Sequence, residues 1–171
     1  MTGEARRNHI LNMLKAQDSP LSGTALANEF RVSRQVIVQD IALMRAENHD
    51  ILSTNRGYLY RREETKPAMP KRVFYVRHRT EQVLEEFLTV TELGGKVLDV
   101  VVEHEIYGQI RVDLLIENSR DAREFHEKMA HSKDNPLMVL TDDRHYHTIA
   151  APSEKLLDLI AQELDQKGFL L

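Results

Sequence analysis

The sequence of 171 residues contains no cysteine. This absence excludes a disulfide framework, thiolate zinc sites and a cysteine nucleophile, and it fits a reducing compartment. No stretch approaches the ~18 consecutive apolar residues of a membrane-spanning helix. Residues 1–14 also lack the continuous apolar segment of a secretory signal. We therefore expect a soluble, cytoplasmic protein.

The charges divide the chain into two unlike parts. Residues 1–72 carry 12 Lys and Arg against 8 Asp and Glu, whereas residues 73–171 carry 11 against 19. A polyanion is attracted to the first part and repelled by the second, which indicates two functions on one chain. Hydrophobic residues make up 42 % of the sequence, which is enough to build a folded core.

The boundary between the two parts coincides with a polar stretch that contains Pro67 and Pro70 and shows no apolar periodicity. We expect a first domain over residues 1–62, a linker over 63–72 and a second domain over 73–171. The alternative is a long surface loop within one domain, although structureless loops of this length are uncommon in compact domains.

The first part has the pattern of three helices followed by a hairpin. Apolar residues at helical spacing predict helices over 4–17, 23–30 and 34–46. Two β-prone runs, 51–54 and 58–60, flank Asn55-Arg56-Gly57, a sequence typical of a hairpin turn. This order of elements is that of a winged helix-turn-helix.

The third predicted helix presents side chains suited to reading DNA. Its buried stripe leaves Arg34, Gln35, Val38 and Gln39 on the opposite face, where Arg can pair with guanine, Gln with adenine and Val with a thymine methyl group. Ser33 at the start of this helix can meet a phosphate, and Arg56 at the hairpin tip can enter a minor groove or hold a phosphate. We therefore predict binding to double-stranded DNA through Ser33, Arg34, Gln35, Val38, Gln39 and Arg56.

Other interpretations of this part are weaker. A helical module for protein contacts would leave the polar face of the third helix beside a basic wing as a coincidence. The segment FRVSRQVIVQDIALMR resembles the helix-turn-helix of many bacterial regulators and of biotin–protein ligases. Single modules of this size bind DNA weakly, and a two-fold dimer that reads two half-sites is the usual remedy, so we expect a homodimer.

The second part alternates strands and helices. The patterns predict strands over 73–76, 97–103, 109–117, 137–140 and 145–150, and helices over 80–93, 121–131 and 154–167. The expected fold class is therefore α/β with two domains, the second an α/β sandwich with a mixed or antiparallel sheet.

A metal site is the main chemical prediction for the second part. His145 and His147 are two residues apart on a predicted strand, which places both side chains on one face with Cα atoms roughly 6.5–7 Å apart. His78 precedes a predicted helix, and Glu86 lies on that helix at the edge of its apolar stripe. Three imidazoles and one carboxylate suit zinc, nickel, iron or manganese. The alternatives are two exposed histidines on an edge strand and a solvated Glu86.

Three segments of the second part, VRHRTEQVLEEF, VVEHEIYGQI and HYHTIAAPSEKLLDLI, resemble the blocks of the three-histidine (3H) domain. A helix-turn-helix followed by that domain resembles the niacin-responsive transcriptional repressor family of Gram-positive bacteria and their relatives. The resemblance implies a cytoplasmic homodimer that represses genes for NAD synthesis and niacin uptake, with nicotinic acid as co-repressor. It also implies one divalent transition metal per subunit, held by His78, Glu86, His145 and His147.

The effector pocket is expected at His104, Tyr107 and Arg111, which can offer an aromatic slot and donors to a pyridine carboxylate. The family's His-Pro-Val-Tyr-Gly motif occurs here with Glu105 in place of the proline, which puts the rigidity of this loop in doubt. The alternative role for His104 is a turn residue satisfied by the backbone.

Two other functions remain open at this stage. One is a metal-dependent hydrolase fused to a DNA-binding element, although the sequence shows no further general base, phosphate loop or nucleophile elbow. The other is a sensor of the metal itself. The regulatory prediction carries no catalytic residues, and we do not expect an enzyme.

Overall fold

The computed structural model describes residues 1–62 and 67–171. The chain divides into two compact units, Met1–Thr65 and Lys66–Leu171. Of the predicted linker 63–72, residues 63–66 lie outside the described residues, residues 67–70 form no helix or strand, and Lys71 and Arg72 already belong to a strand. The domain boundaries at 62 and 73 therefore stay a prediction.

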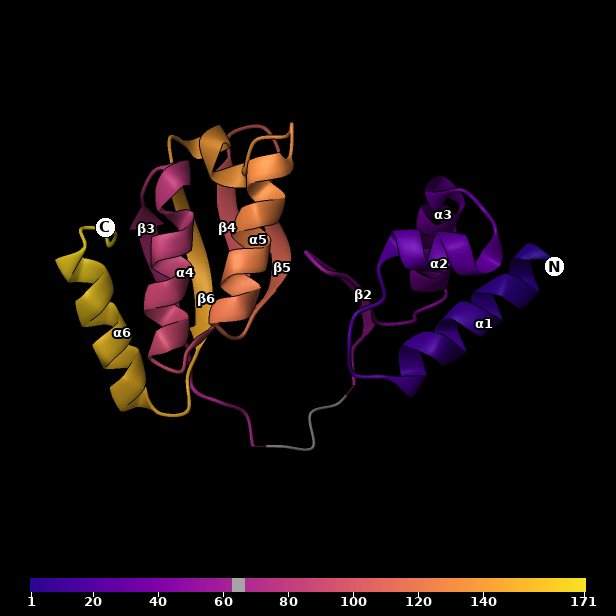
Figure 1. The fold of residues 1–171 in the computed structure, drawn as a ribbon, viewed down its shortest axis with the longest axis horizontal. Helices are drawn as coiled ribbons and strands as arrows, with labels where there is room; N and C mark the ends of the chain where they lie inside the picture. Colours follow the sequence, from indigo (N-terminus) through magenta and orange to yellow (C-terminus); the bar gives the residue numbers. More distant parts are fainter. Residues whose placement is uncertain (63–66) are drawn as a thin grey trace. The chain divides into compact units, whose positions relative to one another are not determined.

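The described residues of the first unit form three helices and a β-hairpin, as the sequence predicts (Figure 1). The helices are α1 (Gly3–Ala16), α2 (Gly23–Phe30) and α3 (Arg34–Ala46). Strands β1 (Ile51–Thr54) and β2 (Gly57–Tyr60) pair antiparallel, with Ile51 opposite Tyr60. An isolated bridge between Leu21 and Tyr58 ties the hairpin to the segment between α1 and α2.

Side-chain caps fix where these helices begin. Thr2, Ser22 and Ser33 each accept a hydrogen bond from the backbone N–H three residues later, which satisfies a donor that has no partner within the helix. The core of this unit collects the predicted apolar stripes of the three helices, with Ile10, Leu26, Ile37 and other residues buried. The polar face of α3 is consequently left outside this core.

The second unit has helices on one side of an antiparallel sheet. Its strands are β3 (Lys71–Arg77), β4 (Lys96–His104), β5 (Gly108–Ile116) and β6 (Arg144–Ala150), in the order β5-β4-β6-β3. Each neighbouring pair in this order is antiparallel. The predicted sheet is thereby confirmed in its antiparallel form.

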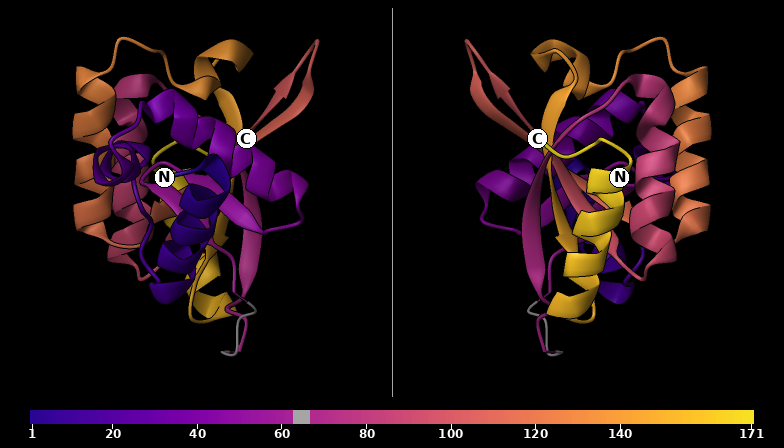
Figure 2. Two further views of the ribbon diagram at one scale, coloured as in Figure 1. Left: turned by 90° about the vertical axis from the view of Figure 1, so that its right-hand side faces the viewer. Right: turned by 90° about the vertical axis from the view of Figure 1, so that its left-hand side faces the viewer.

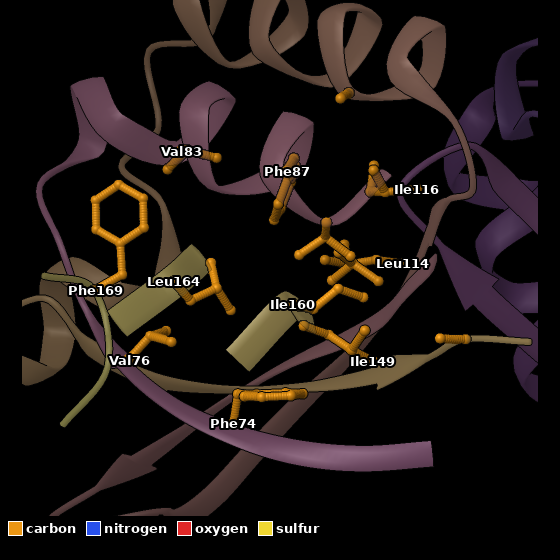
Figure 3. Close-up of a cluster of buried hydrophobic side chains, with 14 of the residues drawn as sticks. Phe74, Val76, Val83, Phe87, Leu114, Ile116, Ile149, Ile160, Leu164 and Phe169 are labelled. Carbon is orange, nitrogen blue, oxygen red and sulfur yellow. The ribbon is translucent and has the colours of Figure 1, made fainter. Parts of the chain in front are cut away.

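Three helices cover one face of this sheet, with α4 between α5 and α6 (Figure 1). Their bounds are Val83–Glu92 for α4, Ser119–His131 for α5 and Glu154–Gln166 for α6, and a short 3-10 helix, η1 (Thr80–Gln82), leads into α4. The core between helices and sheet contains Phe74, Val76, Phe87, Ile149 and other apolar side chains (Figure 3). The histidine-bearing strand β6 lies inside this sheet and presents one face to that core.

The β4–β5 hairpin projects beyond the rest of the sheet (Figure 2). Val101 opposite Tyr146 is the last pair between β4 and β6, whereas the β4–β5 ladder continues to His104 opposite Gly108. The tip of this hairpin carries Ile106 and Tyr107, which are 82 % and 77 % exposed. The loop predicted to line the effector pocket therefore lies at the end of an exposed arm.

The predicted strand over 137–140 is wrong. Leu137–Thr141 forms a 3-10 helix, η2, that begins after Pro136 and ends at two residues with left-handed backbone, Asp142 and Asp143. A β-prone apolar run of this length cannot be told from a short helical turn by periodicity, and the flanking proline and left-handed pair reverse the chain too tightly for a strand.

Among the described residues, none of the helices is long and apolar enough to cross a membrane.

Candidate metal centre and nucleic-acid interface

The four predicted metal ligands lie together between the sheet and α4. His145 and His147 occupy alternate positions of β6, opposite Val76 and Phe74 of β3, so both rings point into the helix-covered side. His78 follows the end of β3, and Glu86 lies on α4. All four residues are buried, with exposed fractions of 1–4 %. The solvated alternatives for Glu86 and for the His-X-His pair are wrong.

One carboxylate oxygen is the centre of this cluster. Glu86 Oε2 lies 2.7 Å from His78 Nε2, 3.3 Å from His147 Nε2 and 3.9 Å from His145 Nε2. The ring of His145 is edge-on to both other rings, with centroids 4.8 Å apart in each pair. Three imidazole nitrogens thus lie within 3.9 Å of one carboxylate oxygen, and His147 stands outside the tighter mutual grouping of His78, Glu86 and His145.

The hydrogen bond that Nδ1 makes in each ring determines whether Nε2 of that ring carries a proton or a lone pair. Nδ1 of His78 lies 3.0 Å from the carbonyl oxygen of Arg79, and Nδ1 of His145 lies 3.0 Å from that of Asp143. Nδ1 of His147 lies 2.5 Å from the carbonyl oxygen of Asp99. A carbonyl oxygen can only accept, so we assign the ring proton to Nδ1 in each case, which leaves an Nε2 lone pair directed at the carboxylate.

Three nitrogen lone pairs that face a carboxylate repel it unless a proton or a metal ion lies between the nitrogens and the oxygen. Burial by itself opposes charge, but the three imidazoles outweigh it and hold the pKa of Glu86 well below its ordinary value. Burial also opposes the charged forms of His78 and His147, yet Glu86 raises the pKa of both rings. Burial dominates at His145 and lowers its pKa. The raised pKa values of His78 and His147 favour a second proton on these rings when no metal ion is bound.

The donor set also fits a metal ion. Ligand atoms of His78, Glu86 and His145 all lie within 4.8 Å of one another. The second oxygen, Glu86 Oε1, is buried and has no hydrogen-bond partner among the described residues. Backbone carbonyls that accept from the far ring nitrogen are the usual support for metal-bound histidines, because they fix both tautomer and orientation. This arrangement suits a borderline divalent ion such as zinc, nickel, iron or manganese.

The sequence analysis missed Asp99, which supports this cluster from β4. Its carbonyl oxygen accepts from His147, and its carboxylate Oδ1 accepts from the backbone N–H of Thr148 at 2.7 Å. Asp99 is 1 % exposed. The only signal in the sequence is one acidic residue within the apolar run 97–102, and nothing local indicates its partners.

The predicted effector residues are less closely grouped than the metal residues. His104 Nδ1 accepts from the backbone N–H groups of Ile106 and Tyr107, so this residue has the turn role that the sequence offered as its alternative. The ring centroids of His104 and Tyr107 are 4.9 Å apart. Arg111 of β5 instead forms ion pairs with Asp99 and Asp113. Their role in effector binding stays a prediction.

The predicted DNA-contacting residues lie on the outer side of the first unit. Arg34, Gln35 and Gln39 of α3 are exposed and Val38 is half-buried, while Ile37, Ile41 and Met44 of the same helix are buried. Ser33 is the exposed N-cap of α3. Arg56 is exposed in the turn between β1 and β2, where Thr54 Oγ1 accepts from its backbone N–H. A polar helix face and a basic hairpin tip are what a winged helix offers to DNA.

A helix-turn-helix unit joined to an α/β unit with a buried histidine–glutamate cluster defines a class of two-domain DNA-binding regulators. Comparison with known proteins agrees: residues 6–59 match an HTH domain family, and residues 71–171 match the 3H domain family. The chain is 39 % identical over 168 residues to a protein named probable transcription repressor NiaR from Thermotoga maritima. That match covers 98 % of this chain and 94 % of the relative.

A second relative, named transcription repressor NadR, comes from Bacillus subtilis and is 35 % identical over 172 residues, with 100 % of this chain and 96 % of the relative covered. The chain therefore belongs to the 3H domain family, in the group that combines this domain with an HTH domain and includes these two transcription repressors. The resemblance stated from the sequence motifs is confirmed, and the hydrolase alternative finds no support among the relatives.

Proposed function

We propose that this protein is a homodimeric, cytoplasmic transcription repressor that controls genes of NAD synthesis and niacin uptake, with nicotinic acid as co-repressor. The observation that carries the proposal is the convergence of three Nε2 atoms on one oxygen of the buried Glu86 carboxylate. A protein that only binds DNA has no use for a buried cluster of this composition, because burying four polar groups costs free energy unless they are compensated. A bound divalent metal supplies that compensation.

The metal would be held by His78, Glu86, His145 and His147. When bound, it would supply positive charge and open coordination positions for a carboxylate or a pyridine nitrogen. The protein's own residues would fix the imidazole tautomers through three backbone carbonyls and exclude water from the cluster. His104, Tyr107 and Arg111 would complete the effector site.

The first unit would bind the operator. Arg34, Gln35, Val38 and Gln39 would face the major groove, Ser33 a phosphate, and Arg56 the wing contact. Two copies would read two half-sites, and nicotinic acid would act by its difference in affinity for the dimer arrangements that do and do not fit those half-sites.

A gel-shift titration tests this proposal. The probe is promoter DNA of niacin-salvage genes from the source organism, and the protein is the full chain, metal-loaded or treated with a chelator, with and without nicotinic acid. We expect nicotinic acid to change the affinity of the metal-loaded chain for DNA. His147→Ala should abolish that change, whereas His131→Ala, at an exposed histidine on α5, should retain it. An affinity that stays constant over the whole nicotinic acid range rejects the proposed effector.

A sensor of the metal itself is the second candidate. This candidate is favoured by the state of two predicted effector residues. Arg111 forms ion pairs with carboxylates, and Tyr107 is exposed at the tip of the β4–β5 hairpin. In the same gel shift, a metal sensor responds to the added divalent ion alone and ignores nicotinic acid. Sedimentation of the full chain with and without DNA tests the proposed dimer.

A further inference from the structure

We propose that Asp99 and Arg111 form a brace that positions His147 for the metal. This inference rests on the proposed metal centre and assigns a role to two residues outside its ligand set. Asp99 lies on β4, one strand away from the histidines of β6, and Arg111 lies on β5 on the other side of β4. Together they connect an exposed part of the sheet to the buried cluster.

The brace begins at an irregularity in the sheet. Between Val97 and Val101, four steps along β4 face three steps along β6, so β4 carries one extra residue there. In a regular ladder the N–H of Thr148 would donate to a backbone carbonyl of β4. Here it donates to Oδ1 of the Asp99 side chain at 2.7 Å.

Because the Asp99 side chain accepts the Thr148 hydrogen bond, the backbone carbonyl of Asp99 is available to the imidazole of His147. Its oxygen accepts the Nδ1 proton of His147 at 2.5 Å. A ligand histidine whose far nitrogen is held this way keeps one tautomer and one ring orientation. The side chain of Asp99 therefore secures the bulge, and its main chain orients the ring.

The Asp99 carboxylate itself needs a partner because it is 1 % exposed. Arg111 supplies one, with Nε 3.1 Å from Asp99 Oδ2, and Arg111 also reaches Asp113 Oδ1 at 3.3 Å. The Arg111 side chain is 58 % exposed, so its loss leaves no cavity in the core. Removing it leaves the buried carboxylate without its opposite charge, which loosens the bulge and the carbonyl that holds His147.

Two variants separate this positioning role from a general contribution to folding. Asp99→Asn keeps an oxygen that can accept from Thr148 and removes the charge that pairs with Arg111. Arg111→Ala removes the partner at an exposed position. The matched control is Arg72→Ala, because Arg72 of β3 also contacts two carboxylates, Glu154 and Asp158, and neither of these ion pairs involves a histidine of the cluster.

The experiment measures zinc and cobalt(II) binding to the full chain by competition with a chromophoric chelator, together with the visible absorption of the cobalt-loaded chain and the melting temperature of the metal-free chain. We expect Asp99→Asn and Arg111→Ala each to weaken metal binding by about 10-fold, within the range known for outer-shell partners. Both should shift the cobalt absorption bands. Arg72→Ala should leave affinity within about twofold and the spectrum unchanged.

Three results overturn the brace. One is wild-type metal affinity and cobalt spectrum in both variants, even if the melting temperature falls. Another is an equal loss of affinity in Arg72→Ala. A third is an Arg111→Ala chain that loses its response to nicotinic acid while its metal affinity stays intact, which assigns Arg111 to the effector instead. A wild-type chain that binds neither metal rejects the metal centre itself, and this result is distinct from the other three.

Discussion

Arg6 of α1 and Asp40 of α3 form a two-point ion pair, with Arg6 Nε 2.6 Å from Asp40 Oδ2 and Arg6 Nη2 3.2 Å from Asp40 Oδ1. Arg7 Nη1 approaches the same carboxylate at 3.6 Å. The Asp40 side chain is 3 % exposed and the Arg6 side chain 15 %. Helix α3 is thus joined to α1 by a shielded pair of charges as well as by apolar packing.

Asp40→Ala should destabilise the first unit by about 2–3 kcal/mol, because it leaves the Arg6 guanidinium partly buried without its carboxylate. Hydrogen exchange of the α3 amides in the full chain measures this change, since it reports on this unit separately. Glu47→Ala, at an exposed carboxylate just after α3, is the control and should change exchange by less than about 0.5 kcal/mol. Equal protection in the two variants would contradict a structural role for the pair.

Gly57→Ala should disrupt the hairpin of the first unit. Gly57 has φ +134°, and a Cβ there would lie 2.3 Å from the carbonyl oxygen of Leu21, the acceptor for the Tyr58 N–H. Gly108→Ala is the matched control, because Gly108 also has a positive φ, +72°, but a Cβ there meets nothing within 4 Å. Both changes add backbone strain of about 1–3 kcal/mol, and the strain is greater at Gly57 because φ +134° lies outside the left-handed region that alanine can adopt.

The steric clash and the greater backbone strain at Gly57 therefore distinguish the two glycine variants. Hydrogen exchange at Tyr58 should become markedly faster in Gly57→Ala, and binding to DNA should weaken with the loss of the wing. The Gly108→Ala chain should keep both properties of the wild type in the first unit. A normal wing in Gly57→Ala would show that the Leu21–Tyr58 bridge is dispensable.

The elements that local chemistry determines could be predicted from the sequence. The bounds of α2 and α3 are as predicted, because Ser22 and Ser33 cap them and their apolar stripes repeat at helical spacing. The strands around the histidines could also be predicted, because their β-prone residues form short runs bounded by turn residues. The run 137–140 failed because four apolar residues carry no period of their own, and the turn that follows depends on Asp142 and Asp143.

The buried polar residues could not be predicted in this way. Asp40 and Asp99 occupy core positions because partners far away in the chain, Arg6 and the backbone N–H of Thr148, lie beside their carboxylates in the fold. Glu86 has the same dependence on His78 and His147. The predicted metal ligands rest on resemblance to a family and on the His-X-His spacing, and the spacing alone does not bring in His78 or Glu86.

Raising the pH should destabilise the metal-free chain. Burial opposes charge on His78 and His147, but Glu86 raises the pKa of both above the ordinary value of 6.5. A raised pKa contributes stability that is fully present below the unfolded value and is lost as the pH rises through the folded value. The lowered pKa of His145 acts in the opposite direction only until the pH passes the ordinary value of 6.5, and the lowered pKa of Glu86 matters only in acid.

Metal binding has the opposite dependence, because each Nε2 must lose its proton before it can act as a ligand. Between about pH 6 and about pH 9, the melting temperature of the chelator-treated chain should therefore fall as the pH rises. The increase in melting temperature on addition of zinc should grow over the same interval. Glu86→Gln should remove the fall in the metal-free chain. A metal-free chain that gains stability over this interval would show that its imidazoles are already neutral at the lower end.

The polar face of α3 should control the affinity for DNA without affecting the second unit. Arg34 and Gln35 are exposed at the start of α3, and losing a bidentate base contact costs about 1–3 kcal/mol at that position of the operator. Arg34→Ala and Gln35→Ala should each weaken binding to DNA selected from a random pool by the wild-type chain. Both should retain metal binding and the wild-type melting temperature.

Arg120→Ala is the control for loss of charge, because Arg120 lies on α5 and its side chain is 77 % exposed. It should leave the affinity for DNA unchanged. A repeat of the titration at several salt concentrations separates the two kinds of contact, since losing a phosphate contact lowers the salt slope by about 1 and losing a base contact relaxes the sequence preference instead. Equal binding by the wild type, Arg34→Ala and Gln35→Ala would place the DNA on another surface of the first unit.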